Sequence, residues 1–240
     1  FARRREIQKL LKSTAPPVPA PRSAPKPASD PSSIEPPFPS PVASPPPRKP
    51  EMLLIGVSTG GPVALASLLP KLPASLPVPI LVVQHMPPLF TASLAGSLDA
   101  KCALTVKEAR DGELALPGNV YIAPGGRHMK IHSEGGEKRI RITDDPPENH
   151  CKPAVDVLFR SVAHGFPGKA AAVILTGMGS DGTLGCRLLK RHGATVIVQD
   201  EASCVVFGMP KEVIQAGMAD VVASLDSLPV EILKAVRGLP

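Results

Sequence analysis

Residues 53–62 read Leu-Leu-Ile-Gly-Val-Ser-Thr-Gly-Gly-Pro, and this stretch decides the fold. The apolar run 53–57 is long enough for one buried strand, and it stops at a serine set among glycines. The Ala/Leu-rich segment 62–69 that follows predicts a helix, with proline in its first turn. A buried strand, a tight glycine turn and a helix in this order are typical of an α/β protein with a parallel sheet.

The pentapeptide 56–60, Gly-Val-Ser-Thr-Gly, fits the G-x-S-x-G pattern of a nucleophile elbow. In that motif a sharp strand-to-helix turn exposes the serine hydroxyl, and the small flanking residues let the backbone turn tightly. A glycine-rich turn also suits a phosphate-binding loop or close packing of a helix on a strand, although neither a full GxGxxG nor a Walker A sequence is present. Ser58 is therefore a nucleophile only if the fold supplies a base and an acid.

The chain divides into two segments of different composition. Residues 1–50 hold 15 of the 31 prolines and the whole excess of positive charge, with nine Lys/Arg against three Asp/Glu. We expect a short helix over 1–13, left from a preceding domain, and a proline-rich linker over 14–50. Residues 51–240 carry 18 charges of each sign and form the expected folded domain, with no basic surplus that would indicate nucleic acid binding.

Other features narrow the class of protein. The four cysteines are far apart and form no C-x-x-C motif, which predicts reduced thiols. No apolar stretch reaches the roughly 18 residues of a membrane span, and the N-terminus has no apolar segment typical of a signal peptide. We therefore expect a cytoplasmic protein that is not inserted in a membrane.

Strand and helix patterns alternate along the domain. We expect strands at 52–57, 79–84, 104–108, 119–123, 170–176, 195–199 and 220–222, and helices at 62–69, 90–98, 153–163, 182–191, 211–216 and 229–236. Segments 129–132 and 138–143, joined through Gly135 and Gly136, predict an antiparallel hairpin. The pattern favours a doubly wound α/β domain.

In doubly wound sheets, functional sites lie beyond the carboxyl ends of the strands. Ser58 meets that rule, and of the six histidines only His85 directly ends an apolar strand. Asp181 lies in the glycine-rich loop after the most apolar strand, while Asp200 and, more loosely, Asp111 also follow strands. An aspartate at the start of a helix is by default an N-cap, so these alternatives stay open.

A serine, a histidine and an aspartate at neighbouring strand ends make chemical sense together. Imidazole can take the serine proton, and a carboxylate on the far ring nitrogen fixes the tautomer and stabilises the imidazolium. The order Ser58, His85, Asp181 differs from the Ser, Asp, His order of α/β-hydrolases, which indicates a different fold. His128 and His132 are four residues apart but lack further metal-ligand partners, so we expect no metal site.

Five longer segments together resemble one family. GVSTGGP, QHMPPLFTASLA, VKEARDGELALPGNVYIAPGGRHM, VILTGMGSDG and QDEASCVVFGMPKEVI are similar, block after block, to the catalytic domain of CheB, the protein-glutamate methylesterase of bacterial chemotaxis. The resemblance covers about residues 52–236. It implies a mainly parallel seven-stranded sheet with an antiparallel hairpin.

The resemblance also implies an activity and its residues. The expected enzyme is a protein-glutamate methylesterase acting on chemoreceptors, with an expected second activity as a protein-glutamine glutaminase (deamidase). Ser58 would be the nucleophile, His85 the base and Asp181 the acid; the backbone N–H groups of His85 and Met178 would bind the oxyanion, and Thr59 and Gly60 would shape the site. No cofactor or metal is implied, while a preceding receiver domain and its histidine kinase are implied partners.

Two other classes remain as alternatives. A phosphate- or nucleotide-binding module would use the glycine turn, but no acidic residue for a ribose follows about 20 residues later. A non-catalytic regulator that docks to receptors would not need all three triad residues.

Overall fold

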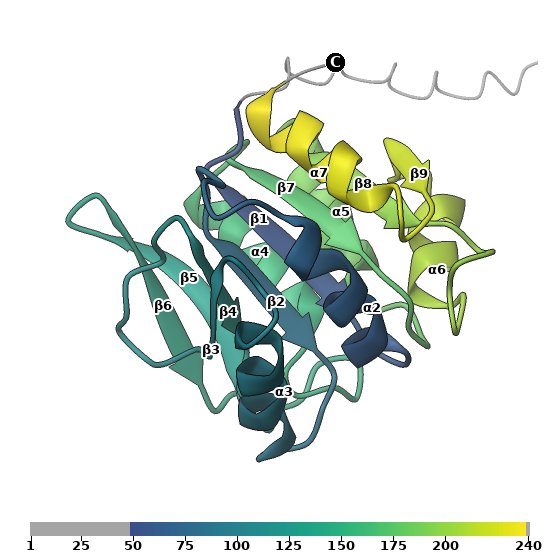
Figure 1. The fold of residues 1–240 in the computed structure, drawn as a ribbon. Helices are drawn as coiled ribbons and strands as arrows, with labels where there is room; N and C mark the ends of the chain where they lie inside the picture. Colours follow the sequence, from purple (N-terminus) through teal and green to yellow (C-terminus); the bar gives the residue numbers. More distant parts are fainter. Residues whose placement is uncertain (1–48, 239–240) are drawn as a thin grey trace, which may run out of the picture. The chain divides into compact units, whose positions relative to one another are not determined.

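Strand β1 (Met52–Val57) is the central strand of the domain, and all six of its residues are buried. The computed structural model describes residues 49–238. The helix expected over 1–13 and nearly all of the linker expected over 14–50 lie outside this range. Figure 1 shows β1 in the middle of the sheet, with helices in front of it and behind it.

The sheet has seven strands in the order β3-β4-β2-β1-β7-β8-β9, and every neighbouring pair is parallel. The strands besides β1 are β2 (Ile80–Gln84), β3 (Thr105–Glu108), β4 (Asn119–Ile122), β7 (Ala170–Ile174), β8 (Thr195–Gln199) and β9 (Val221–Ala223). The predicted fold class is confirmed, and the predicted strands are found to within about two residues at their ends.

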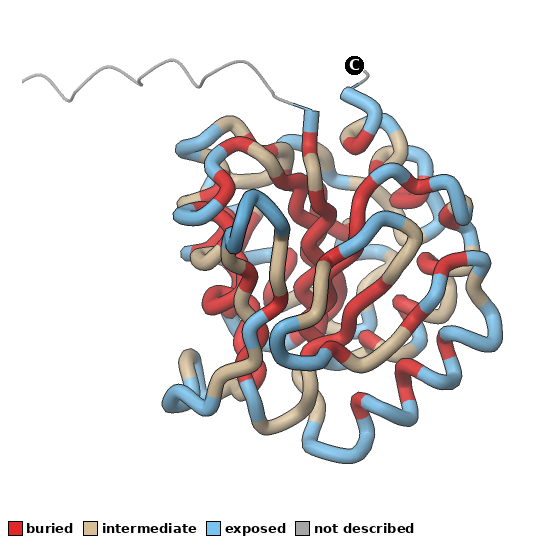
Figure 2. Tube along the Cα trace, turned by 90° about the vertical axis from the view of Figure 1, so that its left-hand side faces the viewer, coloured by how far each residue is buried: buried red, intermediate tan, exposed pale blue. Residues whose placement is uncertain are grey.

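Each face of the sheet is covered because the side chains of the central strands alternate between two apolar clusters. Leu53, Ile55 and Val57 pack with helices α2 (Gly61–Leu68), α3 (Phe90–Asp99) and α7 (Leu228–Arg237) and the short 3-10 helix η1 (Leu69–Lys71). Met52 and Leu54 pack with α4 (Val155–Gly165), α5 (Thr183–Arg191) and α6 (Met209–Gln215). In Figure 2 the central strands are red along most of their length, as strands buried on both faces must be.

The hairpin lies apart from the main sheet. Strands β5 (His128–Glu134) and β6 (Glu137–Thr143) pair antiparallel, with Glu134 opposite Glu137 across the turn. Gly135 and Gly136 have φ values of 59° and 86°, the left-handed conformation that a two-residue hairpin turn requires. Met129, Ile131 and Ile140 belong to the same apolar cluster as α4, so the hairpin is an extension of that layer.

The order of the strands determines which loops form the site. The chain runs from β1 to β2 on one side, and β7 lies on the other side of β1. The loops after these three adjacent strands therefore meet at the carboxyl edge of the sheet, where ligands bind in such folds. No helix among residues 49–238 is long and apolar enough to cross a bilayer.

Candidate active site

The turn that carries Ser58 is fixed by its backbone. The Ser58 N–H donates to the Thr176 carbonyl at 3.0 Å, and the Ser58 carbonyl accepts from the Gly61 N–H at 2.8 Å. The buried Gln84 side chain donates Nε2 to the carbonyls of both Ser58 and His85, at 3.0 Å each. One amide group thus ties the end of β2 to the turn after β1.

Glycines in this turn are required by space and by conformation. Gly60 is the N-cap of α2 and has φ 83°, which glycine adopts without strain. A Cβ added at Gly61 would lie 1.8 Å from Gln84 Oε1. The glycines let α2 start close against β2, which places Ser58 beside the end of that strand.

His85 and Asp181 come together from opposite sides of β1. The loop after β7 brings the Asp181 carboxylate to His85, with Nε2 and Oδ2 2.7 Å apart. The His85 side chain is 12% exposed and the Asp181 side chain 3% exposed. A short bond to a shielded carboxylate holds the ring and favours the Nε2–H tautomer, which leaves the Nδ1 lone pair for proton transfer.

Asp181 is held ionised by the groups around it. Burial acts to raise the pKa of Asp181, but hydrogen bonds from His85, the N–H groups of Asp156 and Val155, and the Asn149 amide outweigh burial and lower it. Val155 N–H lies 2.6 Å from Oδ2, and Asp156 N–H lies 3.0 Å from Oδ1. The negative charge is therefore available to stabilise an imidazolium on His85.

The other ring nitrogen of His85 faces a thiol. Cys151 Sγ lies 3.5 Å from His85 Nδ1. Burial, and then the charge of Asp181, raise the pKa of Cys151, so the thiol stays protonated at neutral pH. His85, Cys151 and Asp181 also offer metal-ligand atoms within 4.8 Å of one another. Because the thiol and the carboxylate face different ring nitrogens, one ion could reach all three only after the His85–Asp181 bond is broken.

A cavity of about 430 Å³ opens where Ser58, Thr59, Gln84 and His85 lie, with Phe90 at its edge. Among the hydrogen bonds of residues 49–238, none joins the Ser58 hydroxyl to His85. Such catalytic contacts are often long without substrate.

Among the backbone N–H groups around Ser58 and the loop after β7, those of Thr59, Gly60 and Met178 have no protein acceptor in the described part of the chain. The expected oxyanion role of the His85 backbone N–H stays a prediction, and in this structure the group already has a protein acceptor. That group donates to the Val57 carbonyl at 3.1 Å, because the pairing of β2 with β1 continues one residue past the strand end.

The other aspartate and histidine candidates from the sequence make structural hydrogen bonds elsewhere. Asp200 accepts from the N–H and hydroxyl of Ser203, and Asp111 accepts from the Ile142 N–H. His128 is fully buried, where it accepts from the Ala154 N–H and contacts the Pro146 carbonyl. None of them lies with Ser58.

Four residues at the site were not found from the sequence. Gln84 and Thr176 bond to backbone groups of Ser58. Asn149 bonds to the Asp181 carboxylate, and Cys151 contacts the His85 ring. Gln84 and Thr176 carry a usable signal, since a polar residue at the end of an apolar run needs a buried hydrogen-bond partner. Asn149 and Cys151 lie in a polar loop with no such signal.

Comparisons with known proteins identify the family of the chain. Residues 53–232 match the family described as CheB methylesterase. The chain belongs to the CheB methylesterase family. The crystal structure of the Thermotoga maritima CheB methylesterase catalytic domain superposes with a TM-score of 0.76 at 46% identity, covering 78% of this chain and 99% of that one.

Curated relatives of this CheB family chain carry a common name. A protein-glutamate methylesterase/protein-glutamine glutaminase of Desulfotalea psychrophila is 57% identical over 191 residues, which is 79% of this chain and 52% of that protein. One of the same name from Trichodesmium erythraeum is 50% identical over 188 residues, 78% of this chain and 53% of that protein. The chain thus spans about half the length of the curated relatives it matches.

Proposed function

We propose that this chain is a serine hydrolase that cleaves glutamyl methyl esters on chemotaxis receptors. The observation that carries the proposal is the buried, ionised Asp181 at 2.7 Å from His85, beside the Ser58 turn. Membership of the CheB methylesterase family supplies the reaction class. By the same acyl-enzyme route it would deamidate specific receptor glutamines, as the names of its relatives state for them.

The chemistry uses protein groups and water. Ser58 Oγ attacks the γ-carbonyl carbon of the ester while His85 Nδ1 takes the hydroxyl proton; Asp181 stabilises the imidazolium through Nε2. The protonated ring then gives that proton to methanol as the carbon–oxygen bond breaks. A water molecule, deprotonated by His85, cleaves the acyl-enzyme and restores Ser58. A rotation of the Ser58 side chain toward Nδ1, in place of the Cys151 contact, precedes the first step.

The oxyanion needs hydrogen-bond donors fixed in place before reaction. The Met178 N–H and an N–H from the turn after Ser58, that of Thr59 or Gly60, are the proposed donors. Each is a backbone N–H without a protein acceptor in the described residues. The N-terminal end of α2 adds a favourable partial positive charge there.

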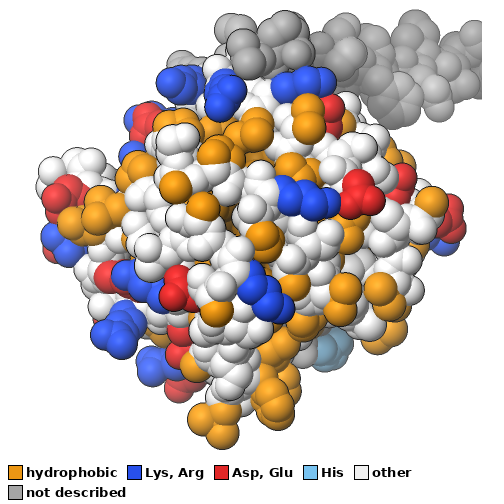
Figure 3. Space-filling view, viewed as in Figure 1, with side chains coloured by type: hydrophobic (Ala, Val, Ile, Leu, Met, Phe, Trp, Pro, Cys, Tyr) orange, Lys and Arg blue, Asp and Glu red, His pale blue; other side chains and the backbone are white. Residues whose placement is uncertain are grey.

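The surroundings suit a side chain carried on another protein. Leu89, Phe90 and Val63 are 85%, 62% and 71% exposed, close along the chain to residues that line the cavity. Figure 3 shows hydrophobic side chains gathered at the lower end of the molecule, where α3 lies in Figure 1. An open site with an apolar border would accept a receptor helix. The proposed setting is the cytoplasm, with a receiver domain and its histidine kinase as regulatory partners.

The test is methanol release from receptor cytoplasmic fragments that carry radiolabelled methyl esters. The intact chain should release methanol, and Ser58→Ala should release none above background while keeping its fold. Ser97→Ala, an exposed serine on α3, is the matched control and should match the wild type. Equal release by wild type and Ser58→Ala would reject Ser58 as nucleophile; release by neither, with fragments that a known methylesterase cleaves, would favour a docking regulator.

A further inference from the structure

Two carboxylates lie buried together behind His85. Asp156, in the first turn of α4, is 1% exposed, and Asp181, just before α5, is 2% exposed. Like charges at such positions repel and are rare without compensating donors. The groups that compensate them are therefore informative.

Asp181 caps α4, the helix that carries Asp156, and Asp156 caps α5, the helix that follows Asp181. Asp181 accepts the N–H groups of Val155 and Asp156 at the start of α4. Asp156 Oδ1 accepts the N–H groups of Gly182 and Gly185 at the start of α5, at 3.0 and 2.7 Å. Both charges thus sit at positive helix ends, and α4 and α5 are fixed to one another at the site.

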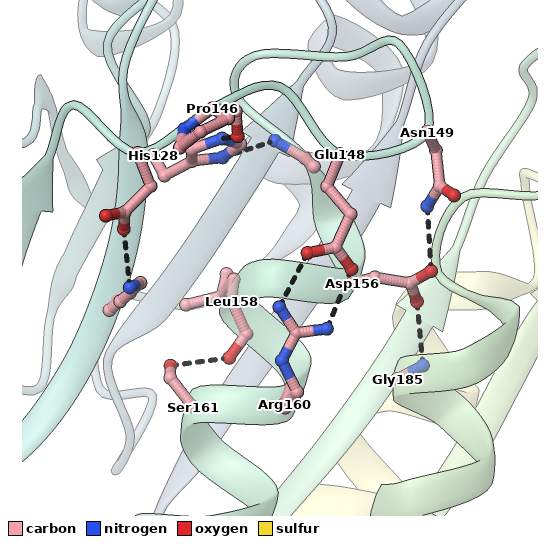
Figure 4. A network of polar contacts seen from close by, with 12 residues as sticks. His128, Pro146, Glu148, Asn149, Asp156, Leu158, Arg160, Ser161 and Gly185 are labelled. Atoms are coloured by element: carbon pink, nitrogen blue, oxygen red, sulfur yellow. Dashed lines mark hydrogen bonds and ion pairs between the residues drawn. The ribbon is translucent and has the colours of Figure 1, made fainter.

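One amide bridges the two carboxylates. Asn149 Nδ2 donates one hydrogen to Asp156 Oδ2 and the other to Asp181 Oδ1, both at 2.9 Å. Figure 4 shows the Asn149 side chain pointing at Asp156, with Gly185 on the far side of that carboxylate. Asp181 Oδ1 is thereby held by Asn149 and a backbone N–H, so Oδ2 stays turned to His85 Nε2.

The turn that presents Asn149 contacts the base as well. Glu148 and Cys151 exchange backbone hydrogen bonds of 3.1 and 2.8 Å, and the two residues between them have φ values of 53° and 60°. These angles fit a type I′ turn, which costs free energy for residues other than glycine. Cys151, at the end of the turn, is the residue whose thiol lies 3.5 Å from His85 Nδ1.

Two side chains, those of Arg160 and His128, hold the loop that contains the turn. Arg160 of α4 forms two hydrogen bonds with the Glu148 carboxylate, at 2.7 and 2.6 Å. His128 Nε2 lies 3.0 Å from the Pro146 carbonyl, and its Nδ1 accepts from the Ala154 N–H at 3.2 Å. Figure 4 shows the His128 and Arg160 anchors around the loop. A loop held in this way can fix the orientation of the Asp181 carboxylate and the His85 ring, which it contacts.

We propose that Asn149 is a positioning residue for the Asp181–His85 pair. Its amide restricts rotation of the Asp156 and Asp181 carboxylates, so that Asp181 Oδ2 stays directed at His85, the residue that must carry the proton. Backbone N–H groups bind both oxygens of Asp181, and the Asn149 amide adds a second donor on Oδ1, the oxygen that faces away from His85. The activity readout of this inference rests on the proposed esterase function.

The test compares Asn149→Gly with Asn119→Ala. Glycine suits the left-handed backbone at position 149, so the variant removes the amide without adding strain. The side chain of Asn119, at the start of β4, donates to two nearby carbonyls in the described part of the chain, and this variant controls for loss of an asparagine. Three quantities are measured: kcat and KM for methanol release, the NMR resonance of the His85 Nε2 proton assigned with His85→Gln, and the melting temperature.

For Asn149→Gly we expect kcat to fall about 10- to 100-fold, as small displacements of reacting groups do, with KM within about twofold. The low-field resonance of the Nε2 proton should move upfield or broaden, and Asn119→Ala should change neither quantity. A lower melting temperature with unchanged kcat and resonance would show a purely structural role and overturn the proposal. Asp156→Asn, which turns an amide toward Asn149, is the second variant and should change the same resonance.

The two proposals fail in different ways. A wild-type chain that releases no methanol contradicts the esterase, yet the resonance still reports whether Asn149 orients the pair. A wild-type chain that is active, with an Asn149→Gly variant equal to it in kcat and resonance, contradicts only the positioning role.

Discussion

His85 Nε2 and Asp181 Oδ2 lie 2.7 Å apart, although 96 residues separate them in the sequence. The contact forms because β2 and β7 flank β1 in a parallel sheet, so the loops after the two strands open on the same edge. The sheet order therefore decides which histidine and which aspartate meet.

Replacing Asp181 by asparagine should reduce kcat by about 10³- to 10⁴-fold, because a carboxamide neither fixes the Nε2–H tautomer nor stabilises the imidazolium. The measurement is the rate of methanol release. Asp226→Asn, at an exposed aspartate whose ion pair among the described residues is with Lys71, is the control and should keep full activity. A kcat for Asp181→Asn within tenfold of wild type would rule Asp181 out as the orienting acid.

Stability should depend on pH through Asp156. Burial is the main cause that raises the pKa of Asp156 to about 6 from the ordinary 3.8. The folded state then binds the proton more tightly than the unfolded chain, so the contribution of this group is fully present below pH about 4. It is lost as pH rises through about 6, by at most about 3 kcal/mol.

Urea unfolding of wild type and Asp156→Asn from pH 4 to 7 measures this contribution. The free energy of unfolding of wild type, relative to that of the variant, should fall across this window. Asp181 acts below it: its lowered pKa gives stability that is present above pH about 4 and is lost at more acid pH. A difference between the two proteins that does not change with pH would show that Asp156 titrates normally.

Gln84→Leu should lower both stability and activity. It removes two hydrogen bonds to the carbonyls of Ser58 and His85 and leaves buried acceptors less satisfied, a cost of about 1–3 kcal/mol. Because the two carbonyls belong to the proposed nucleophile and base, kcat should also fall. Gln215→Leu, at an exposed position of α6, should change neither the urea midpoint nor kcat. Loss of stability with an unchanged kcat would show that Gln84 stabilises the fold and does not affect catalysis.

Gly61→Ala should impair the site through a steric effect. A Cβ at this position would lie 1.8 Å from Gln84 Oε1 and 2.7 Å from Val57 Cγ2, so the Ser58 turn must shift. Gly96→Ala is the matched control, because its Cβ would meet no atom within 4 Å on helix α3. The control should keep kcat and gain up to about 1 kcal/mol from helix propensity. Equal kcat values for the two variants would argue against a tight turn at Ser58.

Much of this arrangement follows from sequence pattern alone. Ser58, His85 and Asp181 could be predicted because each follows an apolar run, and strand ends converge in a parallel sheet. The hairpin was evident from alternation around Gly135 and Gly136. The catalytic roles of the three residues stay predictions until variants are assayed.

The remainder depends on contacts between loops. Asn149 reaches Asp181 only because a turn with two left-handed residues is held by His128 and Arg160, and no local pattern encodes that arrangement. The sequence also does not reveal that strand pairing extends one residue beyond the apolar run and engages the His85 N–H. Both depend on atomic geometry that periodicity does not carry.

The most direct test is labelling with a fluorophosphonate, which reacts with a serine only when a base activates its hydroxyl. Mass spectrometry of digested wild-type protein should find one adduct, on the peptide that contains Ser58, and no adduct there in His85→Gln. An adduct that forms equally fast in His85→Gln, or that forms on another residue while Ser58 stays unlabelled, would contradict activation of Ser58 by His85.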